Sequence, residues 1–272
     1  MKYKAFIKRC ILIIIIPLLS FSCEDGIDPS FFFSPQDDVS LGKQLDSTIS
    51  VNPNEYPILN HTYTKNYVQN IVHEILKSPE IEFKDVFPYK VTIIKDDKTI
   101  NAFATPGGYI YVYTGLLKFV DNEATLAAVL AHEIAHAERR HAAKRMIKQY
   151  GAQVLLSLLL GDNSSQLVEI GANLLTGLAF LANSRSDEFE ADEYSFKYLK
   201  TSNWYPGGIS YFFDKIKSNE GNSSLTKLLS THPLPQDRID AVKKMLTDNN
   251  ISAPTESTIF SKKYSTFKSQ IP

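Results

Sequence analysis

The stretch His132-Glu133-Ile134-Ala135-His136 places two histidines four residues apart and puts a glutamate directly after the first. In a helix, residues four apart lie on one face, so both imidazoles can point at one metal ion. Catalytic zinc usually takes three protein ligands and keeps a fourth position open for water. The Glu133 carboxylate would lie beside that water and could accept its proton. These five residues therefore predict a catalytic metal site that still needs one ligand.

A later acidic run, Asp187-Glu188-Phe189-Glu190-Ala191-Asp192, can supply the missing ligand. The run has the capping and acidic residues that are typical of a helix N-terminus. Glu188 and Asp192 would share one face of this helix, and Glu190 would point roughly the opposite way. We expect one residue of the pair to bind zinc and the other to accept a ring N–H from a zinc histidine. The spacing alone leaves open which does which.

Five further short segments before, between and after these two motifs are informative. They are Ala137-Glu138-Arg139-Arg140-His141, Asn101-Ala102-Phe103-Ala104, Pro106-Gly107-Gly108, Ser184-Arg185 and Ser230-Thr231-His232-Pro233. In order and spacing, the chain from about residue 41 to residue 246 resembles the gluzincin zinc peptidases of metallopeptidase family forty-eight. That family is typified by the HtpX, Oma and Ste CAAX proteases.

The resemblance implies a site with one zinc ion per chain. Its ligands would be His132, His136 and Glu188. Glu133 would be the general base or acid, and Asp192 would hold the ring of a zinc histidine. The resemblance thereby assigns the two roles that the spacing leaves open.

His232 would face the catalytic cleft, again by the resemblance. There it would either stabilise the oxyanion or occupy the open coordination position in a resting form. Without the family context, a histidine before a proline is an ordinary loop residue. Arg140, His141 and Arg185 also match family positions, but helix-surface ion pairs explain them equally well. We assign these three residues no catalytic role.

Two β-branched and aromatic runs, Val91–Ile94 and Tyr109–Tyr113, predict strands separated by a turn-rich interruption. Two interpretations fit this pattern. The runs could form an ordinary half-buried hairpin. Alternatively, an exposed sheet edge at Tyr109, Ile110 and Tyr111 could align an extended substrate through main-chain hydrogen bonds.

Most of the remaining pattern is helical. Apolar residues at three- and four-residue spacing predict an amphipathic helix from about Tyr63 to Lys77, and Asp121 is placed to cap the metal-site helix. Further helices are predicted around 165–182, 187–200, 206–217 and 235–246. The expected fold class is α+β: a mainly helical, zincin-like metallopeptidase domain with a small β-sheet beside the active-site helix.

Between the two metal motifs lies an apolar stretch, Val154–Leu160, and a polar break separates it from a second apolar stretch that ends at Leu181. Neither half has the roughly 20 apolar residues that span a bilayer, and the break would fall at membrane depth. We expect buried core helices or a hairpin that lines the cleft. Peripheral membrane contact is the alternative, because a large apolar patch can mark an interaction site.

The first 22 residues have the features of a secretory signal. Basic residues precede the apolar run Ile11–Leu19, and Cys23 follows at the distance expected for lipoprotein processing. Cys10 lies inside the signal, so Cys23 is the only mature thiol and cannot form an internal disulfide. We expect a lipid on Cys23. The alternative is a chance cysteine beside an ordinary signal-peptidase site.

The sequence predicts one compact domain with flanking segments. A signal peptide (1–22) precedes the lipidated Cys23 and a flexible tether (23–40), and the zinc metallopeptidase domain covers 41–250. The C-terminal tail, 251–272, fits either disorder or packing along the body. Removal of the signal subtracts four basic residues and no acidic ones, which leaves 25 Lys+Arg against 30 Asp+Glu, a net charge of −5. This balance argues against nucleic-acid binding, which needs clustered Lys and Arg.

These features together predict a lipid-anchored, zinc-dependent endopeptidase of a Gram-negative cell envelope. It would sit at the outer membrane, on the periplasmic or surface face, and degrade misfolded or unassembled envelope proteins, with the assembly machinery as a candidate partner. The alternative is a latent or non-proteolytic zinc-binding assembly chaperone. Glu133 favours the enzyme, because a purely structural zinc site needs no general base beside it.

Overall fold

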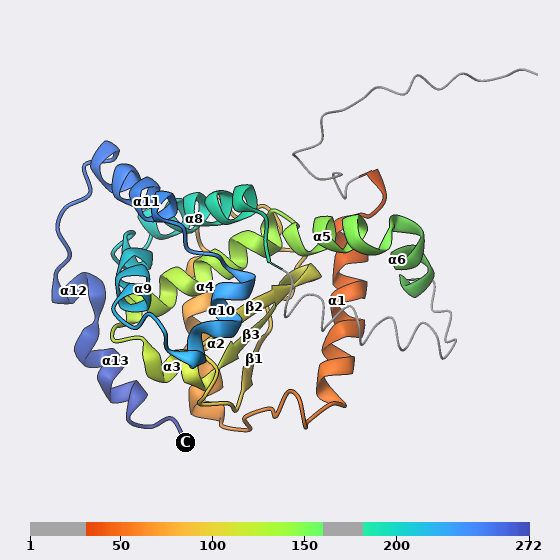
Figure 1. Cartoon of the computed structure of the whole chain (residues 1–272), viewed down its shortest axis with the longest axis horizontal. Coiled ribbons are helices and arrows are strands. Elements are labelled where there is room, and N and C mark those ends of the chain that lie inside the picture. The colour runs from red at the N-terminus through yellow and green to blue at the C-terminus, as the bar shows by residue number, and fades with distance from the viewer. Residues whose placement is uncertain (1–30, 160–181) are drawn as a thin grey trace, which may run out of the picture.

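The computed structural model describes residues 31–159 and 182–272. Helices surround a small mixed sheet with the strand order β1-β3-β2 (Figure 1). The strands are β1 (Val91–Ile94), β2 (Ala102–Thr105) and β3 (Tyr109–Tyr113). Strand β3 pairs in parallel with β1 and antiparallel with β2. The predicted α+β class, mainly helical with a small sheet, is confirmed.

The helices agree closely with the predicted segments. Those predicted from about Tyr63 to Lys77 and around 187–200, 206–217 and 235–246 correspond to α2, α8, α9 and α11. The helix bounds are α1 (Pro35–Ser50), α2 (Thr62–Ile75), α3 (Thr114–Phe119), α4 (Glu123–Glu138), α5 (His141–Tyr150), α6 (Ala152–Leu159), α8 (Arg185–Lys200), α9 (Gly208–Lys217), α10 (Thr226–Thr231), α11 (Gln236–Asp248), α12 (Glu256–Ile259) and α13 (Ser261–Lys268), with 3-10 turns η2 (Pro106–Gly108) and η3 (Ser223–Leu225).

The alternating side chains of β3 divide the interior into two cores. Tyr109, Tyr111 and Tyr113 belong to the core under α1, α5 and α6, whereas Ile110 and Val112 belong to the larger core around α2 and α4. Successive side chains of a strand point to opposite faces, so this five-residue strand contributes to both cores. The sheet is therefore covered on both faces, and α4 lies against the larger core (Figure 1).

Strand β2 is absent from the sequence prediction, and the hairpin, one of the two interpretations of the runs at β1 and β3, is wrong. The runs at β1 and β3 are parallel neighbours, and β2 forms the antiparallel partner of β3. Ala102 and Ala104 have low strand propensity, which hides β2 in the sequence. Both alanines belong to the core that contains α4, where small side chains allow the helix and the strand to approach closely.

One interpretation of the sequence placed a substrate-aligning sheet edge at Tyr109, Ile110 and Tyr111, and this position of the edge is also wrong. These residues lie in the central strand; Ile110, for example, is paired with Val91 on one side and with Ala104 on the other. Main-chain groups that are already paired on both sides cannot bind an added strand. Periodicity identified the strand correctly but gave no information on its place in the sheet.

Helix α4 is buried along its entire length. Its N-cap is Asn122, whose side chain accepts a hydrogen bond of 2.8 Å from the Thr125 N–H, so the prediction of Asp121 as the cap is wrong by one residue. Asp121 instead forms an ion pair with Lys215 on α9. Because every face of α4 is covered, the positions of its polar side chains are tightly constrained by the surrounding elements.

The N-terminal tether ends earlier than predicted. Helix α1 begins at Pro35, and Ser34 and Asp37 form a capping box around its first turn. Leu41 and Ile49 on the inner face of this helix are buried, so the predicted boundary at residue 40 falls inside a packed helix. The serine followed by a proline was a readable start signal, because proline is favoured in the first turn of a helix.

The C-terminal segment packs along the body, which settles the alternative that the sequence left open. Tyr264 and Phe267 on α13 are fully buried, and the Phe267 ring stacks on Tyr67 of α2 with 3.7 Å between ring centroids. Lys263 pairs with the buried Glu123 at the start of α4 at 2.8 Å. The segment is therefore part of the folded domain.

Several predictions concern residues outside the described ranges. They include the signal peptide, Cys23, the helix around 165–182 and most of the apolar stretch between the metal motifs. Within the described part of that stretch, α6 buries Leu155 and Leu158. Among residues 31–159 and 182–272, no helix combines the length and hydropathy of a membrane span.

We expect Phe267→Ala to lower the free energy of unfolding by about 3–5 kcal/mol, because it removes a fully buried ring and leaves a cavity. Urea denaturation measures the change. Val51→Ala is the control, because Val51 is 80% exposed and its truncation should change stability by less than about 0.5 kcal/mol. Equal stabilities of the two variants would contradict the packing of α13.

Candidate metal centre

Helix α4 brings His132 and His136 to one site, one helical turn apart. Both residues are 4% exposed, and their Nε2 atoms lie 3.0 Å from each other. The helical spacing that predicted a shared face thus directs one ring nitrogen of each histidine toward a common point.

Helix α8 contributes the acidic side chains. Its first turn is set by a capping box between Ser184 and Asp187, and its register against α4 is fixed where the Ser195 hydroxyl donates to the Ala128 carbonyl at 3.0 Å. This crossing places the carboxylate of Glu188 against both histidines, at 3.5 Å from Nε2 of His132 and 3.2 Å from Nε2 of His136.

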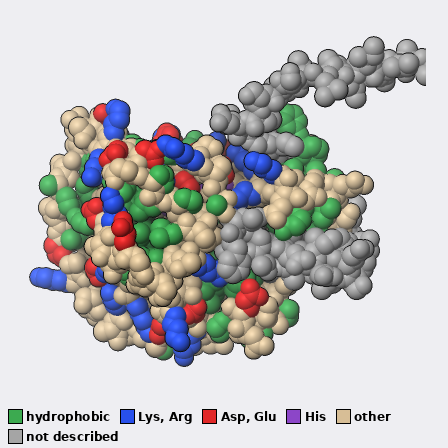
Figure 2. Space-filling model, in the orientation of Figure 1, with side chains coloured by type: hydrophobic (Ala, Val, Ile, Leu, Met, Phe, Trp, Pro, Cys, Tyr) green, Lys and Arg blue, Asp and Glu red, His purple; other side chains and the backbone are tan. Residues whose placement is uncertain are grey.

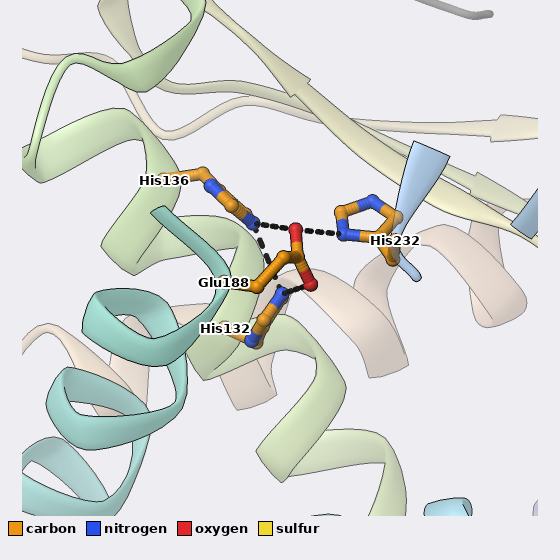
Figure 3. A group of neighbouring side chains, drawn as sticks. All are labelled: His132, His136, Glu188 and His232. Atoms are coloured by element: carbon orange, nitrogen blue, oxygen red, sulfur yellow. Dashed lines mark hydrogen bonds and ion pairs between the residues drawn. The ribbon is translucent and has the colours of Figure 1, made fainter. Parts of the chain in front are cut away.

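His232 completes the cluster from the segment after α10 (Figure 3). Its Nδ1 lies 2.9 Å from Glu188 Oε1, and one donor atom from each of these four residues lies within 4.8 Å of all the others. Ligands at about 2.0–2.1 Å from a tetrahedral zinc ion are about 3.3 Å apart, close to the spacings around Glu188. The donor set of imidazoles and one carboxylate therefore fits zinc in both chemistry and geometry.

Asp192 lies behind His132, one turn after Glu188 on α8. Its Oδ1 is 2.9 Å from Nδ1 of His132, the ring nitrogen that points away from the other donors. A carboxylate in this position accepts the N–H of a metal-bound histidine and fixes its tautomer. The structure brings all the side chains of the predicted zinc site together.

Arg238 on α11 was missed in the sequence, although it contacts both acidic residues. Its Nε and Nη2 donate to the two oxygens of Asp192 at 2.8 and 2.9 Å, and its Nη1 lies 2.5 Å from Oε2 of Glu188. The side chain is 3% exposed. One signal was available: Arg238 precedes the buried Val242 by four residues and so lies on the apolar face of the predicted helix.

Asn183 was also missed. Its side-chain nitrogen lies 2.5 Å from Glu188 Oε1 and 3.1 Å from Nδ1 of His232, and its backbone N–H donates to the Thr231 carbonyl at 2.9 Å. This residue therefore joins the start of α8 to the segment that carries His232. We find no sequence signal for it, because an asparagine before a capping serine is an ordinary loop residue.

Glu133 and His232 face each other beside an apolar pocket. Glu133 Oε1 lies 3.7 Å from Nε2 of His232, and both residues line the pocket with His132. Other lining residues come from β2, α4, α9 and α10: Ala102, Val129, Ile209, Phe212, Phe213, Ile216 and Leu228. Hydrophobic side chains gather where α9, α10 and α11 meet, in the space-filling view (Figure 2).

Burial and the neighbouring charged groups shift the pKa values of Glu188 and His132 in opposite directions. Burial raises the pKa of the Glu188 carboxyl, but His232, His132 and His136 beside it hold that pKa well below its usual range. Burial likewise lowers the pKa of His132, but hydrogen bonds to Asp192 and Glu188 outweigh burial and raise it to about 10. Glu188 is therefore ionised, which is the form that binds a cation.

Arg140, His141 and Arg185, the basic residues that also match family positions, lie in different environments. Arg140 pairs with Asp38 on α1 in a buried contact of 2.5 Å, and Arg185 is exposed and pairs with Asp237. His141 is fully buried against His136, with 2.7 Å between their Nδ1 atoms. Only His141 contacts a predicted zinc ligand.

Comparison with known proteins yields one family and several relatives. The model of peptidase family M48 matches residues 62–246. The chain is 33% identical over 165 residues to the beta-barrel assembly-enhancing protease of Escherichia coli (strain K12), which covers 56% of this chain and 33% of that protein. It is 29% identical over 195 residues to the mitochondrial metalloendopeptidase OMA1 of Schizosaccharomyces pombe, covering 71% of this chain and 56% of that protein. The chain thus spans about a third of the bacterial relative and about half of the mitochondrial one.

We expect Arg238→Met to destabilise the metal-free protein by about 3–5 kcal/mol, because it leaves two buried carboxylates without their shared cation. Urea unfolding in the presence of a chelator measures the loss, and added zinc should restore part of it. Arg185→Met is the control; its side chain is 70% exposed, so the change should be about 1 kcal/mol or less. Similar losses in both variants would argue against this role for Arg238.

Proposed function

Because the chain belongs to peptidase family M48, we propose that it is a zinc-dependent metalloendopeptidase that binds one zinc ion per chain. The ligands in this proposal are His132, His136 and Glu188. The observation that carries the proposal is the convergence of these donors on one point, with Glu133 beside an apolar pocket. When bound, zinc supplies Lewis acidity, which makes a water easier to deprotonate and a peptide carbonyl easier to attack.

Glu133 is the general base in this mechanism. It directly follows His132 on α4 and is 3% exposed, so its carboxylate is held at the pocket with little freedom. It accepts a proton from the attacking water and then delivers that proton to the amine that leaves. The buried position also limits competing contacts of this carboxylate with bulk water.

His232 stabilises the negative oxygen that develops on the substrate carbonyl. Nδ1 of His232 lies 3.1 Å from the Asn183 side-chain nitrogen and 2.9 Å from Oε1 of Glu188, and these two contacts hold the ring with Nε2 on the side of Glu133. An N–H on Nε2 can then donate across the pocket toward the reacting carbonyl. Preorganised donors of this kind act where charge develops and need no rearrangement during the reaction. Asn183 is thus a positioning residue for His232.

In this proposal, strand β2 takes the substrate-aligning role that one interpretation of the sequence gave to β3. It is an edge strand of the sheet, and Ala102 at its start lines the pocket with Glu133. An extended peptide that adds to this edge would carry its scissile bond past Glu133. Recognition through main-chain groups requires an unfolded segment, which fits misfolded or unassembled substrates.

The relative in Escherichia coli is named a beta-barrel assembly-enhancing protease. By this similarity, we propose unassembled outer-membrane β-barrel proteins as substrates and the envelope assembly machinery as a partner. The proposed location is the outer membrane, with a lipid on Cys23 as the anchor. The proposed domain comprises the body from α1 to α13.

A second candidate function rests on His232. Its Nδ1 belongs to the same donor cluster, and four protein ligands would close the coordination shell as in structural zinc sites. Such a closed site would suit a latent protease or a chaperone that binds client proteins without cutting them. Zinc binding without cleavage of any unfolded client would favour this candidate.

We expect Glu133→Gln to retain zinc and to lower cleavage of an unfolded outer-membrane β-barrel protein by at least about a hundredfold, because the base is lost and the ligands are kept. Zinc content and a gel-based cleavage assay on the purified protein provide the two measurements. Glu193→Gln on the exposed side of α8 is the control and should cleave normally. Cleavage that persists in Glu133→Gln would reject the proposed mechanism.

The pocket predicts a preference for a small aliphatic side chain next to the scissile bond. Its free volume is only about 20 Å³, close to a single water site, and apolar side chains form most of its wall. Phe212→Val should widen it and shift the ratio of kcat/KM for leucine over alanine peptides by about tenfold in favour of leucine. Tyr211→Val, a neighbour that does not line this pocket, should leave the ratio unchanged. An unchanged ratio in Phe212→Val would rule out this subsite.

A further inference from the structure

His141, the first residue of α5, has no part in the mechanism described above, yet it lies directly behind a proposed zinc ligand. The side chain is fully buried. Its Nδ1 lies 2.7 Å from Nδ1 of His136, and its Nε2 lies 2.9 Å from Oε2 of Glu190 on α8. The three side chains form a line that runs from the centre of the site to the half-buried Glu190.

This contact depends on the break between α4 and α5. In a continuous helix, residues five apart are rotated by about 140°, so His141 would point away from His136. Arg140 instead adopts a left-handed backbone with φ of 57°, which ends α4 and turns His141 back toward it. Arg140 is itself held by Asp38 and by the Phe33 carbonyl at 2.8 Å. A non-glycine residue in this conformation needs such support from its surroundings.

The direction of each hydrogen bond in the line follows from the position of the zinc donors. Nε2 of His136 faces the other donors, so a metal at the site takes this nitrogen and the proton of the ring is on Nδ1. His136 must then donate to Nδ1 of His141. A neutral imidazole has one N–H, so the proton of His141 is on Nε2, which donates to Glu190.

We propose that His141 and Glu190 form a positioning relay that fixes the tautomer and ring orientation of the zinc ligand His136. The inference rests on the proposed zinc peptidase function and deepens it. The two zinc histidines would then be held in two ways: His132 by direct contact with Asp192 at 2.9 Å, and His136 by a carboxylate that acts through an intervening imidazole.

The far end of the relay is fixed as well. Arg139 donates from Nε to Oε1 of Glu190 at 2.7 Å, so the two oxygens of Glu190 have different partners. The carboxylate cannot rotate away without losing both contacts. Glu190 points away from the zinc site, as the sequence predicted. From that side of α8 it holds His141, and through His141 it orients the ring of His136.

The test compares two substitutions of His141 by the zinc dissociation constant, measured by competition with a chromogenic chelator. His141→Phe keeps an aromatic ring but removes both nitrogens, and should weaken zinc binding by about 10–100-fold. His141→Asn places an amide oxygen near the position of Nδ1, so it should recover part of that loss. His73→Phe, at an exposed histidine of α2, is the control. Unchanged zinc affinity in His141→Phe would overturn the relay.

A second measurement needs no variant of the relay. Histidine-selective nitrogen NMR of the zinc-loaded wild-type protein should show His136 protonated at Nδ1 and His141 protonated at Nε2 only. A proton on Nδ1 of His141 would reverse the first hydrogen bond and overturn the proposal, even if His141→Phe merely fails to fold. Both readouts are independent of cleavage. If the protein cleaves substrate and His141→Phe keeps the wild-type zinc affinity, the relay alone is rejected. If His141→Phe weakens zinc binding but the wild-type protein cleaves no substrate, the peptidase function is rejected.

Discussion

The central constraint on this fold is that a group of ionisable side chains is buried where α4 and α8 cross. Glu188 and Asp192 are at most 2% exposed, and an unpaired buried carboxylate would cost several kcal/mol. Arg238 contacts both, and the histidines of α4 supply the remaining partners. The elements that carry these residues are far apart in the sequence, so the compensation of charge is possible only when α4, α8 and α11 pack together. Stability and site geometry therefore depend on the same contacts.

A helix that is buried on every side needs its ends to be fixed as well as its faces. Glu123 in the first turn of α4 accepts from Trp204 Nε1 at 3.0 Å and pairs with Lys263. Glu138 at the opposite end is unfavourable for the helix dipole, but it accepts the N–H groups of Glu82 and Phe83 at 2.8 and 3.1 Å and a hydroxyl from Tyr89. Two buried carboxylates thus fix the ends of α4, which limits its sliding relative to α8.

The sequence was informative wherever one element carries the whole signal. Four-residue spacing placed His132 with His136 and Glu188 with Asp192, because helical periodicity is local. It was uninformative about contacts between elements: Arg238 and Asn183 reach the site from other segments, and no local pattern indicates what a buried arginine will contact. The central position of β3 was missed for the same reason, since strand order depends on chain paths that periodicity does not record. Resemblance to a family supplied roles but not these neighbours.

The segments outside the family match also contribute to the site. Helix α1 precedes the matched residues 62–246, yet Asp38 on α1 holds Arg140, whose left-handed backbone directs His141 toward His136. A chain of four residues, Asp38, Arg140, His141 and His136, therefore connects α1 to a proposed metal ligand. Removal of the α1 contact would free Arg140, and with it the turn that positions His141. At the opposite end of α4, Lys263 of α13 acts on Glu123. The helix that carries His132 and His136 is thus held from both sides by segments that the family pattern does not include, which explains why the matched region alone does not define the folded unit.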